Sequence, residues 1–167
     1  MRCIALLISW LAAAVAWAGE TVYLPPDQFV AQAFDGRMPK PDVIWLTQEV
    51  TKQVSQILGH APSQLRQRYW RDGDRSVFVL DEIGKEEPIT AGFIVEKGRI
   101  TKTQVLVYRE SRGGEIRHAP FLKQYEGARL NDEMRLDRSI DGISGATLSV
   151  RAMERMARAA LYLDSIK

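Results

Sequence analysis

The chain has 167 residues, with 23 Lys and Arg against 21 Asp and Glu and a formal net charge of +2. This near balance gives no reason to expect nucleic acid or an anionic membrane surface as a partner. One cysteine, Cys3, excludes an internal disulfide, and the length suits a single domain with a real hydrophobic core.

The first 18 residues have the pattern of a secretory signal. Arg2 precedes an apolar run over 4–15 that is too short to span a bilayer comfortably, and Ala16-Trp17-Ala18 is an A-x-A-like cleavage site. We predict that 1–18 is a signal peptide that is cleaved; an uncleaved N-terminal anchor is the alternative. Cleavage would remove Cys3, and with it every thiolate nucleophile and every cysteine ligand for zinc or an iron–sulfur cluster.

We predict that residues 19–71 form an N-terminal helical segment. A short helix is expected at 27–34, behind a pair of prolines, and a longer one within 42–60, where apolar residues recur at helical spacing. Asp42 is the predicted N-cap of the longer helix and Gly59 its C-terminal stop. The apolar positions of this helix are Val43, Leu46, Val50, Val54 and Ile57.

From Leu65 onward the pattern is that of β-strands. Runs rich in β-branched and aromatic residues are separated by the turn sequences DGD, GKEEP and EKGR. The last two runs predict a hairpin around Lys97-Gly98. The expected strands cover 65–70, 76–83, 89–96 and 99–109.

A closing helix is predicted at about 149–163, after a short amphipathic segment at 121–130. Arg151, Glu154, Arg155 and Arg158 are expected in water, with Glu154 and Arg158 as a favourable pair four residues apart. The residues expected to be buried are Val150, Met153, Met156 or Ala157, Ala160 and Leu161. The predicted fold class is α+β, an antiparallel sheet with an N-terminal helical segment and a C-terminal helix.

The common catalytic patterns are missing from the sequence. His60 and His118, the two histidines, lie far apart and neither has a ligand-type partner at helical spacing, so we expect surface or hydrogen-bonded groups and no metal site. No histidine is placed to activate a serine, and no hydrolase or phosphate-loop motif occurs. A hydrolase is therefore disfavoured.

Two charged stretches have plain structural interpretations. The stretch 66–75 mixes arginines with Tyr69 and Trp70, as in a stacking platform for single-stranded nucleic acid, or as in an amphipathic strand with arginines on its outer face. The balanced net charge favours the strand. The stretch 81–88, DEIGKEEP, predicts a solvated acidic turn.

A cluster of small and hydroxyl residues precedes the closing helix. Gly142 and Gly145 permit unusual backbone conformations, and Gly145 would let a ligand approach the chain closely. The free N–H groups at the start of a helix attract anions, phosphate above all. From these residues alone the turn is either an anion site or a helix start capped by one of its hydroxyls, Ser144, Thr147 or Ser149.

The order Asp141-x-x-Ser144-Gly145-Ala146-Thr147-x-Ser149 resembles the flavinylation motif of the FMN-binding domain family. That family includes flavoprotein subunits of the sodium-translocating NADH:quinone reductase and of the Rnf complex. In it, the threonine carries FMN through a phosphoester bond, which a flavin transferase makes outside the cytoplasm with FAD as donor. The resemblance implies that Thr147 is the acceptor and that Asp141 and Ser149 match positions that the transferase recognises.

A second stretch, Ala91–Ile116, resembles the strand, turn, strand and Glu-Ser/Thr-x-Gly loop of the same family, so that the resemblance covers about 72–163. It implies an FMN-binding domain over 72–167, after the signal at 1–18 and the helical segment at 19–71. Arg112-Gly113-Gly114 departs from the proline and glycines usual there. The implied cofactor-binding residues are Thr147, Ser144, Gly145, Ala146, Leu148 and Ser149 around the phosphate and Glu110, Ser111 and Gly113 beside the ring. Tyr108, Phe121 and Tyr125 are expected either to stack on the ring or to belong to the core.

The resemblance implies an exported electron carrier with FMN covalently bound at Thr147, in the periplasm or at the outer face of the cytoplasmic membrane. Its partners would be a flavin transferase and a redox protein or membrane electron-transport complex. It would be a substrate of the transferase and not an enzyme with its own substrate. The alternatives are a redox sensor or regulatory module with non-covalent FMN, and a cofactor-free binding module in which the motif is a helix cap.

Overall fold

The computed structural model describes residues 19–167, and the predicted signal at 1–18 lies outside the described residues. Within that range the strands form one six-stranded antiparallel sheet, in the spatial order β1-β6-β5-β4-β3-β2. The α+β fold class is confirmed. The strands are β1 (Thr21–Val22), β2 (Asp42–Trp45), β3 (Arg66–Asp72), β4 (Arg75–Ile83), β5 (Pro88–Glu96) and β6 (Arg99–Tyr108).

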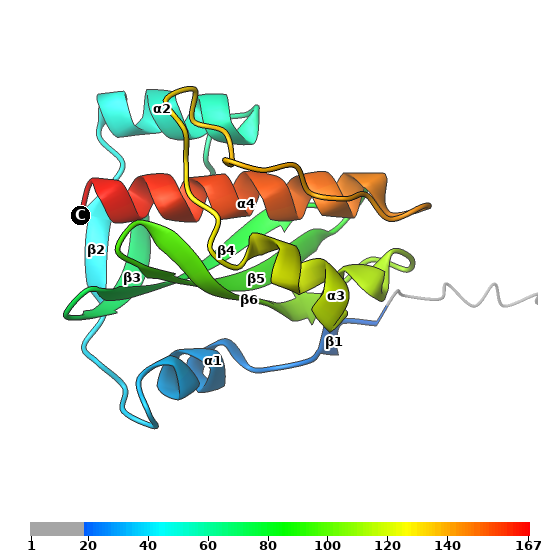
Figure 1. Cartoon of the computed structure of the whole chain (residues 1–167), viewed down its shortest axis with the longest axis horizontal. Coiled ribbons are helices and arrows are strands. Elements are labelled where there is room, and N and C mark those ends of the chain that lie inside the picture. Colours follow the sequence, from blue (N-terminus) through cyan, green and yellow to red (C-terminus); the bar gives the residue numbers. More distant parts are fainter. Residues whose placement is uncertain (1–18) are drawn as a thin grey trace, which may run out of the picture.

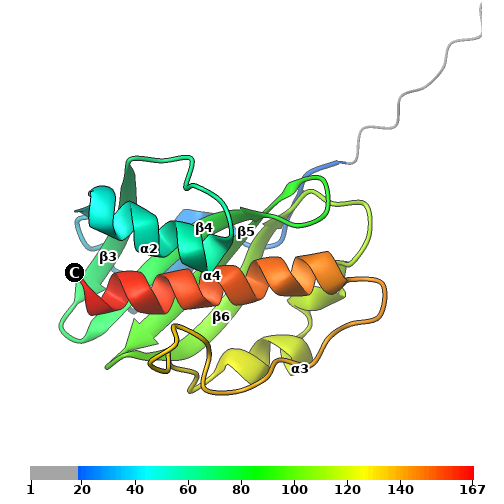
Figure 2. The same cartoon turned by 90° about the horizontal axis from the view of Figure 1, so that it is seen from above.

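Helices lie on both faces of the sheet. Figures 1 and 2 show α4 crossing one face with α2 beside it, while α1 lies on the opposite face. The larger apolar core fills the space between the sheet, α2 and α4, and a smaller core lies under α1. The α-helices are α1 (Pro26–Ala33), α2 (Gln48–Leu58), α3 (Ala119–Leu122) and α4 (Thr147–Ser165), and the short 3-10 helices are η1 (Gly114–Arg117) and η2 (Lys123–Tyr125).

The longer N-terminal helix begins later than predicted. Asp42 does not cap it: Asp42–Trp45 forms β2, which pairs with β3, and α2 starts at Gln48. Thr47 is the true N-cap, since its side chain accepts a hydrogen bond from the backbone N–H of Val50. The helix ends at Gly59 in the left-handed conformation, as predicted. The segment 19–71 therefore contributes β1, β2 and all but the last residue of β3 to the sheet, in addition to its helices.

The central hairpin is confirmed. β5 and β6 pair across a two-residue turn in which Lys97 has φ of +51° and Gly98 φ of +70°. Both residues have positive φ, which matches the right-handed twist of the flanking strands. The predicted short segment at 121–130 is irregular and contains the end of α3 and η2.

Helix α4 is longer than predicted at both ends. Two of its arginines, Arg155 and Arg158, were predicted to face water but make contacts within the fold. Its predicted apolar face is buried, and Arg151 is exposed. Arg155 is only partly exposed and pairs with the buried Glu82 of β4, with Nη2 2.9 Å from Oε1. Arg158 donates a 2.7 Å hydrogen bond to the carbonyl of Met134. Among the ion pairs of residues 19–167 none joins Arg158 to Glu154.

Across residues 19–167, no helix is both long enough and apolar enough to cross a membrane.

Helix α1 packs directly on a glycine of the sheet. A Cβ at Gly92 of β5 would overlap the ring of Phe29, which is buried. We expect Gly92→Ala to lower the free energy of unfolding by about 1–3 kcal/mol, since overpacking displaces the ring. Urea unfolding measures this. Gly142→Ala, where no atom lies within 4 Å, is the matched control and should change stability by less than about 0.5 kcal/mol. Equal stability of the two variants would contradict this packing.

Candidate functional site

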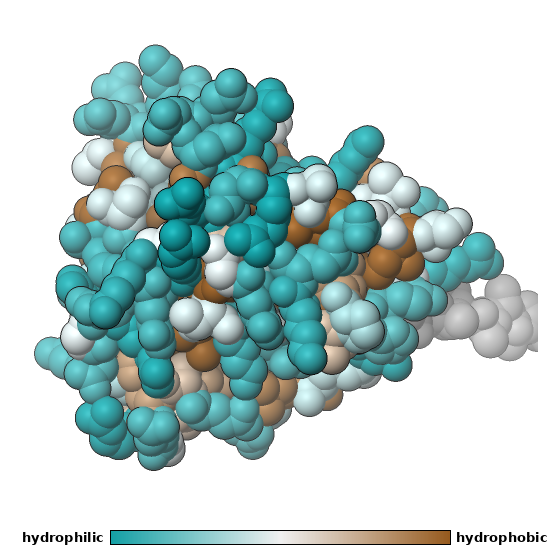
Figure 3. All heavy atoms as spheres, viewed as in Figure 1, coloured by the Kyte–Doolittle hydropathy of each residue, from teal (hydrophilic) through white to brown (hydrophobic). Residues whose placement is uncertain are grey.

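The small-residue turn lies directly before α4, at the end of the molecule that also holds β1 and η1 (Figure 1). Thr147 is the first residue of the helix and is exposed, as are Ser144 and Gly145, whereas Ala146 is buried. Gly145 has φ of +81°, a conformation that glycine adopts without strain. In Figure 3, white and brown spheres interrupt the teal surface in this region.

No side chain of residues 19–167 caps the start of α4. Its N-cap residue is Ala146, and none of the hydroxyls of the turn accepts a hydrogen bond from the first turn. The predicted alternative of a hydroxyl-capped helix start is therefore wrong. The amide groups of the first turn are left without a side-chain acceptor within the described residues, and they carry the positive end of the helix dipole. This is a favourable place for a phosphate group.

Two open hollows adjoin the turn, with volumes of about 590 and 630 Å³, which is the usual size range for small-molecule sites. Hollow A is bordered by Lys85, Glu86 and the residues from Gly145 to Ser149. Hollow B is bordered by Tyr23, Tyr108, Arg117, His118 and Ser144, among others. Glu110, Ser111, Arg112 and Gly145 border both hollows.

The loop Glu110–Gly113 that follows β6, named the site loop, lies between the two hollows. It contains Glu110, Ser111 and Gly113, so the structure brings these predicted residues beside the turn Ser144–Ser149. Asp141 borders neither hollow; it is exposed, and its N–H donates a 2.7 Å hydrogen bond to the Gln124 side chain.

Glu110 braces this loop against the turn between β4 and β5. One carboxylate oxygen, Oε1, accepts hydrogen bonds from three consecutive backbone N–H groups, those of Lys85, Glu86 and Glu87. The distances to the amides of Glu86 and Glu87 are 2.8 and 3.2 Å. Glu110 therefore shapes the wall of hollow A, and this oxygen is already engaged by the chain itself.

A second brace joins the loop to α4. The Tyr108 hydroxyl donates to the carbonyl of Arg112 and lies 3.3 Å from Oγ of Ser149. Burial raises the pKa of Tyr108 above its usual value, which keeps the donor proton in place. A methyl group at Gly113 would lie 3.2 Å both from Cβ of Ala146 and from Oγ of Ser149. The loop thus packs tightly on the first turn of the helix.

The other two candidate stacking residues belong to the core. Phe121 and Tyr125 are buried and contact each other edge to face, with ring centroids 5.6 Å apart. Tyr108 is also buried, but it borders hollow B.

Known proteins match this part of the chain. Residues 84–162 match the family described as FMN-binding domain. These residues belong to the FMN-binding domain family. They contain β5, β6, the site loop, the small-residue turn and most of α4, so every residue of the two braces lies inside the FMN-binding domain. β4 and the N-terminal segment lie outside the matched residues.

A solved structure has the same fold. NqrC of Shewanella oneidensis superimposes with a TM-score of 0.54 over 82% of this chain and 96% of its own, at 16% identity. At this identity the likeness concerns the fold. No curated protein matches the chain.

The sequence did not point to Tyr23 or Lys85, which border the two hollows, whereas it did mark Arg112 as a departure from the family's loop. Tyr23 reaches hollow B from the N-terminal segment, where Arg117 lies over its ring at 5.0 Å. Lys85 borders hollow A and pairs with Glu86. Arg112 borders both hollows, and within residues 19–167 its guanidinium takes part in no hydrogen bond or ion pair. These positions come together through tertiary contacts, for which a single sequence carries no local signal.

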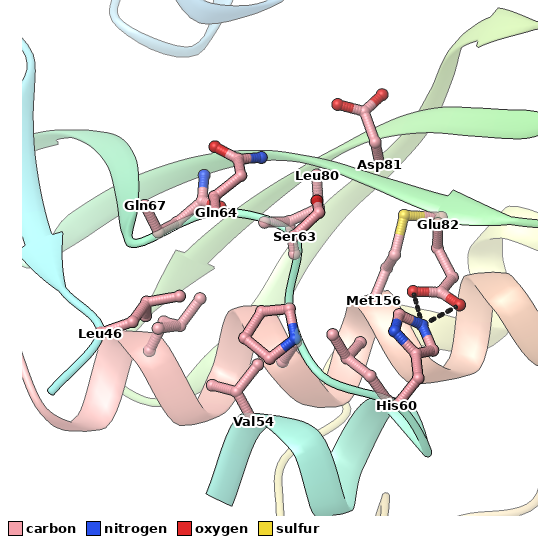
Figure 4. A pocket seen from close by; sticks show the side chains of 14 residues that line it. Leu46, Val54, His60, Ser63, Gln64, Gln67, Leu80, Asp81, Glu82 and Met156 are labelled. Atoms are coloured by element: carbon pink, nitrogen blue, oxygen red, sulfur yellow. Dashed lines mark hydrogen bonds and ion pairs between the residues drawn. The ribbon is translucent and has the colours of Figure 1, made fainter. Parts of the chain in front are cut away.

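A smaller pocket of about 70 Å³ lies away from the motif, between α2, β4 and α4 (Figure 4). At its rim Nε2 of His60 is 2.9 Å from Oε1 of Glu82, whose side chain is 1% exposed. Arg155 binds the same carboxylate. The predicted solvated acidic turn is therefore wrong for Glu82, which is a buried, doubly paired charge. His60 is hydrogen-bonded, and no group of three acidic, histidine or cysteine side chains in residues 19–167 is arranged to hold a metal ion.

The Arg-rich stretch forms an ordinary amphipathic strand. Tyr69 is buried in the main core and stacks on Phe78, with ring centroids 5.6 Å apart, while Arg66 and Arg68 of β3 are exposed. A ring held in this way is not available to stack on a base, which agrees with the preferred interpretation.

Removing the carboxylate of Glu110 should loosen the turn between β4 and β5. Three amides would lose a charged acceptor, so we expect Glu110→Ala to cost about 1–3 kcal/mol of stability. Hydrogen exchange of the Lys85–Glu87 amides, followed by NMR, should quicken in the same variant. Glu115→Ala removes an exposed carboxylate of the neighbouring η1 and should leave these amides unchanged. Protected amides in Glu110→Ala would show that the carboxylate does not hold the turn.

The His60–Glu82 contact should make stability depend on pH. The hydrogen bond to the Ala61 carbonyl, the hydrogen bond to Glu82 and its charge raise the pKa of His60, and these outweigh burial and the charge of Arg155. A raised folded-state pKa gives stability that is present below the unfolded pKa of about 6.5 and is lost as pH rises through the folded value. The difference in unfolding free energy between wild type and His60→Gln should therefore be larger at about pH 5.5 than at about pH 8. A difference that grows toward high pH would contradict the assignment.

Proposed function

We propose that the chain is an exported electron-transfer protein that carries FMN through a phosphoester bond to the side chain of Thr147. The observation that carries the proposal is the position of Thr147. It is exposed, it is the first residue of a helix without a side-chain cap, and it borders a hollow of suitable size. The FMN-binding domain over 84–162 supplies the cofactor class.

The residues around Thr147 suit a flavin phosphate. The amides of the first turn of α4 offer donors, and Gly145 leaves room for a close approach. Arg112 and Lys85 supply positive charge at the border of hollow A. Ser144, Ala146 and Leu148 would complete the phosphate end, and Ser111 and Gly113 of the loop would lie beside the ring; all of them border one of the two hollows. Bound FMN would supply the reversible electron uptake, and the chain would supply attachment, orientation and electrostatics.

In the attachment step, FAD would donate its FMN moiety to Thr147 and release AMP. Oγ of Thr147 would attack the phosphorus on the FMN side of the pyrophosphate. The bond between that phosphorus and the bridging oxygen breaks, and AMP leaves with the bridging oxygen. The threonine proton passes to a base of the flavin transferase. An exposed Thr147 and an exposed Asp141 in the same turn are accessible to such an enzyme.

The location outside the cytoplasm determines which redox partners the protein could meet. Export rests on the predicted signal at 1–18, and a covalent bond would keep the flavin from diffusing away after export. The flavin would exchange electrons with a redox protein or a membrane electron-transport complex in the periplasm or at the outer face of the cytoplasmic membrane. The shared fold with NqrC is consistent with this setting.

Co-expression with a flavin transferase in an exporting host tests the attachment. A denaturing gel viewed under ultraviolet light should show a fluorescent band for wild type and no band for Thr147→Ala, because the acceptor oxygen is gone. Thr147→Ser keeps a hydroxyl and is the matched control, which should retain a band. Flavin that copurifies with wild type but is lost on denaturation would indicate the non-covalent sensor instead. A colourless wild-type protein would refute both flavin functions.

A second measurement separates the carrier from the sensor. The flavin of the loaded protein should be reduced by a membrane fraction supplied with an electron donor and reoxidised on removal of the donor. A flavin that no membrane donor reduces would count against the carrier.

A further inference from the structure

Ser149, the last residue of the motif, is placed where an enzyme would not reach it. Its side chain belongs to a residue that is 4% exposed, on the inward face of the first turn of α4. Thr147 and Asp141, in contrast, are exposed. Recognition by a flavin transferase requires contact, and in the folded chain Ser149 offers almost no surface for it.

The hydroxyl of Ser149 has a definite partner inside the fold. The single proton of the Tyr108 hydroxyl goes to the carbonyl of Arg112. The remaining lone pairs of Tyr108 therefore accept, and the Ser149 hydroxyl donates to them across 3.3 Å. The chain of hydrogen bonds runs from α4 through the end of β6 to the site loop.

The space around this contact is filled. Gly113, which is buried and has φ of +85°, lies against Ser149 and Ala146 so closely that a methyl group would be 3.2 Å from both. A substitution at Ser149 therefore alters contacts with the site loop, whereas it changes almost nothing on the solvent-exposed surface. The loop, in turn, borders both hollows beside Thr147.

We propose that Ser149 is a positioning residue: through Tyr108 it holds the loop Glu110–Gly113 against the start of α4, and flavin attachment at Thr147 depends on it through the shape of the site. This inference rests on the proposed function. It assigns the two outer positions of the motif different roles, an exposed Asp141 that an enzyme can touch and a buried Ser149 that acts within the fold.

The test compares Ser149→Ala with Tyr108→Phe, which removes the partner hydroxyl from a residue outside the motif. Loading by a flavin transferase with FAD is followed as initial rates over a range of protein concentration. Each variant should lose about five-fold in loading, the factor that one buried hydrogen bond corresponds to, and the double variant should lose no more than either single one. Visible-range circular dichroism of the attached flavin should change in the same way in all three.

Matched controls are Ser55→Ala and Tyr69→Phe, which delete a helix hydroxyl and a buried tyrosine hydroxyl away from the site. Both should load normally. If Ser149→Ala loads poorly while Tyr108→Phe matches wild type in loading and dichroism, the enzyme reads Ser149 directly and the proposal is overturned. Normal loading and dichroism of Ser149→Ala would overturn it as well.

Two further outcomes are decided by the same experiment. Should Ser149→Ala fail to fold, Tyr108→Phe, which keeps the aromatic ring, decides alone by its loading and dichroism. Absence of a covalent flavin on wild type refutes the attachment itself, and the Tyr108–Ser149 coupling is then read from a double-mutant cycle of unfolding free energies, in which additive losses overturn the positioning role.

Discussion

One tyrosine hydroxyl joins the three parts of the candidate site. Tyr108 ends β6, donates to the backbone of Arg112 and meets the hydroxyl of Ser149 on α4. The sheet, the loop between the hollows and the start of the helix are thereby fixed to one another. Because the hydroxyl is buried, each of these bonds is stronger than it would be in water and costly to lose. The position of Thr147 relative to the loop depends on this contact.

The rest of the fold stabilises that arrangement. α4 is packed along the sheet by the main apolar core, and farther along the helix Arg155 binds the buried carboxylate of Glu82, which His60 also contacts. Glu110 ties the turn between β4 and β5 to the site loop. The helix start that these contacts hold in place has no side-chain cap among residues 19–167, so no side chain described there competes for its amides.

The parts of the fold that were predictable are those with local signals. Lys97-Gly98 marks the hairpin, Gly59 marks the end of α2, and the 3.6-residue spacing of apolar residues marks α4. β2 was missed because Val43 and Leu46 fit the helical spacing, and its pairing with β3 is a contact between distant residues. The burial of Glu82 depends on partners 22 and 73 residues away, and that of Ser149 on Tyr108, 41 residues away. No local pattern reports such contacts. For the site, the resemblance pointed to the turn and the loop, which the fold brings together, but not to Tyr23 or Lys85.

Mass spectrometry of the mature protein after co-expression with a flavin transferase tests the central claim most directly. We expect one added mass equal to FMN less one water, and fragmentation that assigns it to the side chain of Thr147. An unmodified chain, or the added mass on another residue of the turn such as Ser144, would contradict it.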